Sequence, residues 1–151
     1  MGLRRRSREK ALQILYSIEF NKTLTLSEAA TMYYEYFNLS GKCVPQDGDN
    51  EEYNFIVYLL GEVEKNIEQV ESLIEEAAIN WRMERIALIE RNILRMSVAE
   101  LIDTDNGVPF KATINEAIDI AKKFGSRDSS SFVNGIINKV ADILDVKNTK
   151  L

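Results

Sequence analysis

The sequence predicts an all-α fold, and three observations support this prediction. Apolar residues recur every three or four positions through most of the chain, which is the pattern of helices with one buried face. No segment shows the sustained alternation of apolar and polar residues that a half-buried strand requires. The 151 residues include only two prolines and seven glycines, so few positions interrupt a helix.

The first part of the chain predicts a series of helices separated by one clear loop. A helix at 7–20 has one apolar face, formed by Ala11, Ile14, Leu15 and Ile18. A second helix, rich in tyrosine, is expected at 26–38. The loop at 39–52 contains glycine and proline and ends the helical pattern. Helical spacing resumes at 52–66 and continues to about 79, with a bend expected near Asn66.

The second part of the chain predicts three more helices. The first covers 88–102, with four candidate core residues: Ile89, Ile93, Met96 and Leu101. The sequence TINE at 113–116 predicts a capping box at the start of the next helix. Lys122, Lys123 and Gly125 then favour its end, with the glycine as a left-handed cap. The last helix is expected at 129–144, and its core stripe consists of Val133, Ile136, Ile137, Val140 and Leu144.

The composition excludes several classes of function. The chain has no histidine, which rules out Ser-His-Asp and Cys-His catalysis and every metal site that contains histidine. Its single cysteine, Cys43, cannot form an internal disulfide, which fits a protein of the reducing cytoplasm. The longest apolar run, FIVYLLG at 55–61, is too short to span a bilayer. We therefore expect a non-enzymatic protein with no cofactor, no metal and no membrane partner.

Positive charge is concentrated at the start of a chain whose net charge is −5. Residues 1–10 carry one acid, Glu9, and five basic residues: Arg4, Arg5, Arg6, Arg8 and Lys10. Clustered arginines bind phosphate groups, so a basic tail at 1–8 is a candidate contact for nucleic acid. The alternative is a solvated terminus without a ligand. Because the acidic remainder of the chain repels nucleic acid, binding is expected at this one edge.

Other candidate binding residues lie on the first and last predicted helices. Tyr16 lies off the apolar face of its helix, where the ring either contacts a partner or covers a second helix. Phe132 falls in the first turn of the last helix and either stacks an unpaired base or joins the core. Asp128 precedes that helix, where it either accepts from a base N–H or caps the helix. Inside a helix, Gly135 lowers helix stability by about 1 kcal/mol relative to alanine. A close approach by another helix or a ligand would explain a glycine there, and is therefore expected.

Four stretches, in this order, resemble the NusB family of transcription antitermination factors. They are RRRSREKALQILY at 4–16, IERNILRMSVAEL at 89–101, VPFKATINEAIDIAKKFG at 108–125 and DSSSFVNGIINKV at 128–140. The similarity covers nearly the whole chain, although the loop at 39–52 does not contribute to it. The resemblance implies one domain over 1–151, with about seven helices in two small packed bundles.

The resemblance also implies partners and the residues that bind them. NusB factors pair with the ribosomal protein NusE and bind the single-stranded boxA element of nascent RNA. With other Nus factors they keep RNA polymerase elongating through ribosomal RNA operons. The residues implied for RNA are Arg4, Arg5, Arg6, Arg8, Lys111, Asp128 and Phe132. Those implied for NusE are Tyr16 and Glu90.

Two other interpretations remain open. The RNA-binding domain fused to some RNA cytosine methyltransferases shares this fold, but residues 1–151 contain no methyltransferase segment. In the other, the chain is a purely protein-binding helical adaptor or a homodimer, and the basic residues bind nothing. Salt-dependent RNA binding with and without residues 1–8 distinguishes this last interpretation from the antitermination factor.

Overall fold

The protein is helical throughout the part of the chain that the structure describes. The computed structural model describes residues 2–20, 22–39, 51–79 and 81–145. These ranges contain seven α-helices, one short 3-10 helix and no strand, which confirms the all-α prediction. No described helix has both the length and the apolar character needed to cross a membrane. Most of the predicted loop at 39–52, including Cys43, lies outside the described residues.

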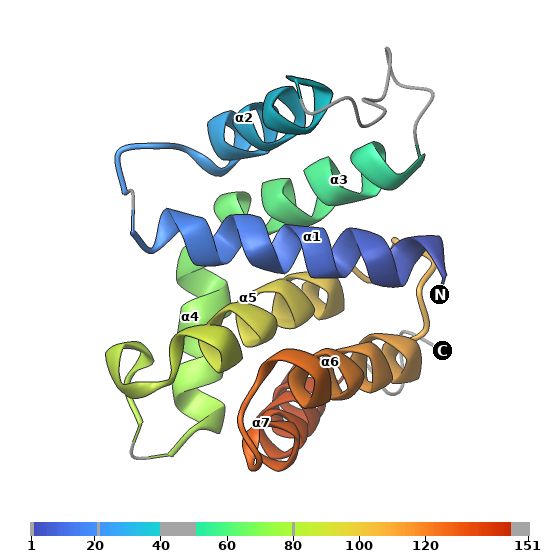
Figure 1. Ribbon diagram of the computed structural model, residues 1–151. Coiled ribbons are helices and arrows are strands. Elements are labelled where there is room, and N and C mark those ends of the chain that lie inside the picture. The colour runs from blue at the N-terminus through green and yellow to red at the C-terminus, as the bar shows by residue number, and fades with distance from the viewer. Residues whose placement is uncertain (1, 21, 40–50, 80, 146–151) are drawn as a thin grey trace. The chain divides into compact units, whose positions relative to one another are not determined.

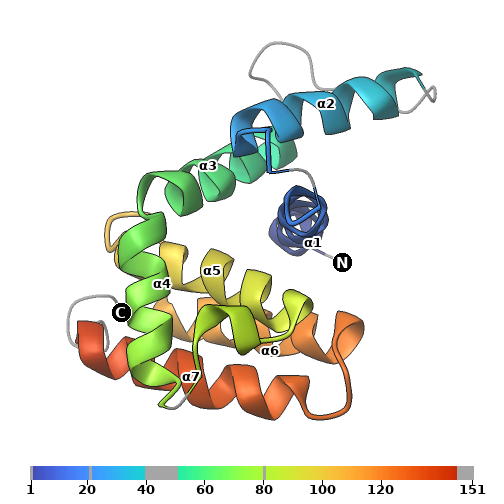
Figure 2. The ribbon, with the colours of Figure 1, turned by 90° about the vertical axis from the view of Figure 1, so that its left-hand side faces the viewer.

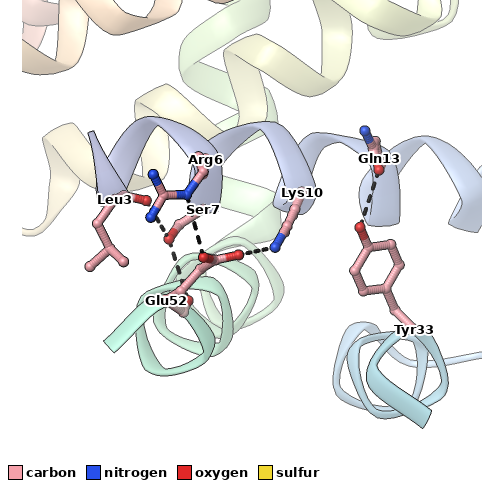
Figure 3. Close-up of polar contacts among 7 residues, drawn as sticks. All are labelled: Leu3, Arg6, Ser7, Lys10, Gln13, Tyr33 and Glu52. Carbon is pink, nitrogen blue, oxygen red and sulfur yellow. Dashed lines mark hydrogen bonds and ion pairs between the residues drawn. The ribbon is translucent and has the colours of Figure 1, made fainter. Parts of the chain in front are cut away.

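The chain divides into two compact units, Met1–Glu64 and Lys65–Leu151, as expected for two small bundles. The first unit contains α1 (Leu3–Ile18), α2 (Leu26–Leu39) and α3 (Glu51–Lys65), shown in Figure 1. The predicted apolar face of α1 is largely buried, with Ile18 at its margin. The hydroxyl group of Tyr33 on α2 donates to the side-chain oxygen of Gln13 on α1 at 3.3 Å (Figure 3). Burial raises the pKa of Tyr33, and the negative charge of Glu52 on α3 adds to this effect.

Helix α1 begins earlier than predicted. The sequence pattern placed its start at residue 7, but the helix runs from Leu3 to Ile18, with Gly2 at the N-cap. Arginine is a good helix former, and no proline or internal glycine interrupts residues 3–8, so the helix extends back through the arginines. The hydroxyl group of Ser7 supports this first turn by donating to the carbonyl oxygen of Leu3 at 2.9 Å. The predicted basic tail is therefore the first part of a helix.

Helix α2 starts with a capping box that the sequence analysis missed. The backbone N–H of Glu28 donates to the hydroxyl oxygen of Thr25, and the backbone N–H of Thr25 donates to the Glu28 carboxylate, both at 3.0 Å. These two bonds satisfy backbone donors that the first helical turn leaves free. The bond from the Thr25 N–H is also the main reason that the pKa of Glu28 lies below its usual 4.5.

The second unit packs four α-helices around one core. It contains α4 (Ile67–Ala77), the 3-10 helix η1 (Met83–Arg85), α5 (Leu88–Ile102), α6 (Phe110–Phe124) and α7 (Ser129–Leu144). Helices α6 and α7 form an antiparallel pair joined by a short turn, and α5 packs against both of them (Figure 2). Helix α4 contacts α5 and α7. An ion pair of 3.2 Å between Arg95 of α5 and Glu71 of α4 reinforces this packing.

The predicted core and boundaries of this unit agree well with the structure. Helices α5 and α7 begin and end at the predicted residues, and the expected bend near Asn66 is a full interruption between α3 and α4. Most predicted core residues are buried: Ile93, Met96, Leu101, Val133, Ile136, Ile137 and Val140. Ile89 and Leu144 lie at the margin of the core, where they are half-buried.

The predicted capping box at 113–116 is wrong. Helix α6 already begins at Phe110, and the carbonyl oxygen of Pro109 accepts from the N–H groups of Ala112 and Thr113. Proline before the first turn is compatible with a helix start, because its fixed φ suits the entry and it lacks only an N–H. Thr113 consequently lies inside the helix and is buried, and its hydroxyl group has no partner among the described residues.

Two predictions about glycine also need correction. Gly125 follows α6 as expected, but its backbone is extended (φ −90°) rather than left-handed. A side chain is excluded there by a close approach instead: a Cβ atom on Gly125 would lie 2.4 Å from the hydroxyl oxygen of Ser129. At Gly135 the structure contradicts only the predicted approach of another helix, because the residue is exposed and has no described atom within 4 Å of a Cβ position; the approach of a ligand stays a prediction.

These two glycines are expected to respond to the same substitution with opposite sign. Gly135→Ala should raise the free energy of unfolding by about 0.5–1 kcal/mol, because alanine is the better helix former and its methyl group meets open space. Gly125→Ala should lower it, because the methyl group displaces Ser129. Urea unfolding of both variants measures the two changes. Gly61→Ala in α3 is a matched control for Gly135, since it too meets open space. Equal signs for Gly125→Ala and Gly135→Ala would contradict this account.

Candidate functional site

The arginines at the start of α1 contact α3 of the same unit. Arg4 and Arg8 are one helical turn apart, and both guanidinium groups lie over the ring of Phe55, at 4.6 and 5.1 Å from its centroid. A cation above an aromatic face is attracted by the electrons of the ring. Arg8 is only 4% exposed, whereas Arg4 is open to solvent. Arg4 is thus available to a ligand in a way that Arg8 is not.

Glu52 on α3 holds the neighbouring basic residues of α1. Its carboxylate lies 3.7 Å from the Nε atom of Arg6 and also pairs with the ammonium group of Lys10 (Figure 3). The hydroxyl group of Ser7, between them, donates to the backbone carbonyl of Glu52 at 3.4 Å. Arg5 is half-buried in the same turn of the helix. Part of the positive charge of this segment is therefore balanced inside the unit.

Tyr16 lies at the other end of α1, roughly 18 Å along the helix from Arg4 at 1.5 Å per residue. Its side chain is 37% exposed, as expected for a residue off the apolar face. Its ring lies 5.3 Å from that of the exposed Phe20, tilted by 58°. The sequence analysis missed Phe20, although the spacing of four residues between two aromatic side chains was a usable signal. Together the two rings form an exposed aromatic pair.

In the second unit, Glu90 of α5 is linked to the start of α7. The buried hydroxyl group of Ser129 donates to the Glu90 carboxylate at 2.7 Å. The same hydroxyl oxygen accepts from the backbone N–H of Ser126 at 2.8 Å, which closes the turn after Gly125. The predicted protein-contact residue Glu90 thus also holds the helix that carries Asp128 and Phe132. Charge reversal at Glu90 is therefore expected to affect the fold, because it removes the acceptor of this hydrogen bond.

Asp128 and Phe132 are the candidate ligand contacts at the start of α7. Asp128 occupies the N-cap position, but its exposed side chain makes no capping hydrogen bond. Its negative charge is still favourable next to the positive end of the helix dipole. Phe132 is half-buried, and its ring lies edge-on to the ring of Trp81, with centroids 6.4 Å apart. Both candidate residues thus retain surface that a ligand can contact.

Lys111 lies away from these residues. It is exposed in the first turn of α6 and lines a shallow cavity of about 420 Å³. The cavity lies between α6 and α7, and its other lining residues are Phe110, Ile114, Asn115, Ile118, Asn134 and Asn138. Because α6 and α7 are antiparallel and Phe132 is three residues into α7, Lys111 and Phe132 lie roughly 15 Å apart along the pair. The structure brings Glu90, Asp128 and Phe132 together within the second unit, and places Lys111 apart from them.

The chain is similar to known proteins of the NusB family. Residues 5–142 match the model of the NusB family. The transcription antitermination protein NusB of Myxococcus xanthus is 37% identical over 145 residues, which cover 96% of this chain and 99% of that protein. NusB of a Geobacter species (strain M21) is 39% identical over 150 residues, covering 97% of this chain and 99% of that protein.

Solved structures show the same fold. NusB of T. maritima has a TM-score of 0.75 at 27% identity, over 92% of this chain and 90% of that one. A structure of the antitermination factors NusB and NusE in complex with double-stranded RNA also gives a TM-score of 0.75, at 23% identity, over 95% of this chain and 98% of the matched chain. At that identity the second likeness concerns the fold alone.

The hydrogen bonds at the turn before α7 predict different roles for two adjacent residues. Ser129→Ala removes the bonds to Glu90 and Ser126, and should lower the free energy of unfolding by about 1–3 kcal/mol, because buried partners lose their hydrogen bonds. Asp128→Ala should change it by less than about 0.5 kcal/mol, because the exposed carboxylate caps nothing. Urea unfolding of both variants tests this contrast. A larger loss for Asp128→Ala than for Ser129→Ala would show that Asp128 caps the helix.

Proposed function

This chain belongs to the NusB family of transcription antitermination proteins, a family of factors rather than enzymes, and from this premise we propose that it binds boxA-type single-stranded RNA together with the ribosomal protein NusE. In this proposal the heterodimer joins an RNA polymerase elongation complex with other Nus factors and acts on ribosomal RNA operons. The observation that carries the proposal is the convergence of Glu90, Asp128 and Phe132 around the first turn of α7.

The chemistry of this region suits an unpaired base next to a protein partner. A partly exposed aromatic ring can stack on a base, and stacking is available to any base because each has a π-face. The free carboxylate of Asp128 can accept hydrogen bonds from base N–H groups, but it repels phosphate. A protein of the same fold has been seen with NusE and double-stranded RNA, so the fold itself can accommodate partners of this class.

The arginines of α1 are proposed to add affinity that does not depend on RNA sequence. Arg4 retains an exposed guanidinium group while it rests on Phe55, so a phosphate can approach without displacing it. A guanidinium held in place before binding loses less conformational freedom than one on a flexible tail. Lys111 is proposed as a separate phosphate contact at the far end of α6.

One observation favours the second candidate, a protein-binding adaptor or homodimer without RNA. Phe55 and Glu52 engage the basic residues of α1, and the aromatic pair Tyr16–Phe20 is exposed at the other end of that helix. The basic residues of α1 are thus partly engaged within the unit, and the exposed aromatic pair at its other end suits contact with a protein. RNA binding by the purified protein separates the two candidates.

The contrast between Arg4 and Arg8 tests the RNA proposal. Arg4→Ala should weaken binding of every single-stranded RNA and lower the slope of log K against log salt by about 0.7, the value for one lost phosphate contact. Arg4→Lys keeps the charge and should keep the slope. Arg8→Ala should leave the slope of the folded protein unchanged but lower its stability by about 2 kcal/mol, because it removes a desolvated cation from the ring of Phe55. Fluorescence anisotropy at several salt concentrations gives the slopes, and the proposed role of Arg4 fails if its two variants behave as wild type.

The proposed pairing with NusE depends on Tyr16. Tyr16→Ala should weaken the complex by about 2 kcal/mol or more, since exposed aromatic residues often dominate interfaces. Tyr16→Phe retains the ring contact with Phe20 and should lose less affinity for NusE than Tyr16→Ala. Calorimetric titration with NusE measures both, and RNA affinity without NusE serves as the control that should not change. Wild-type affinity for NusE in Tyr16→Ala would remove this end of α1 from the interface.

A further inference from the structure

Trp81, the only tryptophan of the chain, is 48% exposed in the segment between α4 and η1. Trp81 is not a core residue; the nearby side chains of Met83 and Ile86 are buried instead. The backbone N–H groups of Trp81 and Met83 are nevertheless held in place by hydrogen bonds. The N–H of Trp81 donates to the carbonyl oxygen of Ala78, and the N–H of Met83 donates to the carboxylate of Glu75, at 2.8 and 2.9 Å. The indole therefore projects from an anchored segment without being buried by it.

The contact between Trp81 and Phe132 joins this segment to the start of α7. The two rings meet at 78°, an edge-on arrangement. Edge-on pairs are stable, but unlike stacked pairs they do not cover both rings face to face. Since both side chains are also partly exposed, aromatic surface remains for a further flat ring. Phe132 is already proposed to contact RNA, so Trp81 extends that surface into a segment 51 residues earlier in the chain.

The residues around this pair favour nucleic acid over a purely apolar partner. Arg82, Arg85 and Arg127 are exposed, and none of them forms an ion pair with another described residue. They balance the three exposed acids nearby, Glu75, Glu84 and Asp128, in a chain that is acidic as a whole. Aromatic rings with interspersed arginines form the usual surface for single-stranded nucleic acid.

Gly135 supplies an independent observation. It lies three residues after Phe132, so the two positions are neighbours on the surface of α7. Glycine costs about 1 kcal/mol there relative to alanine, and no described atom occupies the space of a Cβ. The fold thus gains nothing from this glycine within the described residues, whereas a ligand lying beside Phe132 gains room to approach the helix backbone.

We propose that Trp81 is a base-stacking residue, and that its indole and the ring of Phe132 together hold one unpaired base of a single-stranded RNA. This inference rests on the proposed RNA-binding function and adds a contact to it. The base stacks on exposed aromatic surface, and Arg82 or Arg127 lies near enough in sequence to the two rings to meet the flanking phosphates. The contribution of the indole itself is independent of salt, because stacking neutralises no charge.

The single tryptophan makes the proposal directly measurable. The intact protein is titrated with end-labelled boxA-type RNA, and the anisotropy of the label and the emission of the indole are followed together. Stacking should quench the indole over the same concentration range in which the anisotropy rises. Trp81→Ala should weaken binding about 5- to 150-fold, with an unchanged salt slope. Trp81→Phe, which keeps an aromatic face, should recover much of the affinity.

Ile79→Ala is the matched control, because Ile79 is an apolar side chain in the same segment and is 62% exposed. It should bind RNA as wild type does. An equal loss in Ile79→Ala would mean a general apolar contact and would overturn the stacking role. RNA binding with unchanged indole emission and wild-type affinity in Trp81→Ala would also overturn it, while leaving the proposed function intact. If the wild-type protein binds no RNA, the proposed function fails, and this inference fails with it. Thermal melting of each variant shows that the comparison is made between folded proteins.

Discussion

The close approach of Ser129 to Gly125 is the constraint on which the second unit depends. A side chain on residue 125 would occupy the position of the Ser129 hydroxyl group, so only glycine allows the turn to close. From that position Ser129 bonds to both Ser126 and Glu90, and joins α7 to α5 as well as to its own turn. A buried serine closes the turn, and the side chain of the N-cap residue Asp128 makes no capping hydrogen bond. The buried hydroxyl group of Ser129 stabilises the turn, and the side chains of Asp128 and Phe132 keep exposed surface for binding.

In the first unit, contacts with α3 likewise hold the basic residues of α1 and leave one arginine exposed. An acidic protein that carries a basic helix must balance part of that charge, and Glu52 does so for Arg6 and Lys10. Phe55 holds two further guanidinium groups without neutralising them, since a ring attracts a cation but carries no net charge. Arg4 therefore keeps its full charge in a fixed position. A helix ordered in this way differs from a flexible basic terminus, because its geometry is set before any ligand arrives.

Helix positions and core stripes could be predicted from the sequence because they depend on local periodicity, whereas the starts of α1 and α6 depended on context. The pattern T-x-x-E occurs at both 25–28 and 113–116, but only the first is a capping box. At the second, Pro109 starts the helix four residues earlier, and Thr113 is drawn into the core. Local spacing also identified Asp128 and Phe132 as neighbours. It could not identify the bond between Glu90 and Ser129, 39 residues apart, or the contact of Trp81 with Phe132, because both depend on tertiary packing.

That long-range bond has a consequence for any protein that contacts Glu90. The carboxylate of Glu90 already accepts a hydrogen bond from Ser129, so a partner that draws it away changes the support of the first turn of α7. Coupling of this kind is reciprocal: whatever a partner at Glu90 does to a ligand at Asp128 and Phe132, that ligand does to the partner. A partner that leaves the bond intact produces no coupling by this route. In the proposed function, the protein contact at Glu90 and the RNA contacts at Asp128 and Phe132 are therefore linked through one buried hydroxyl group, that of Ser129.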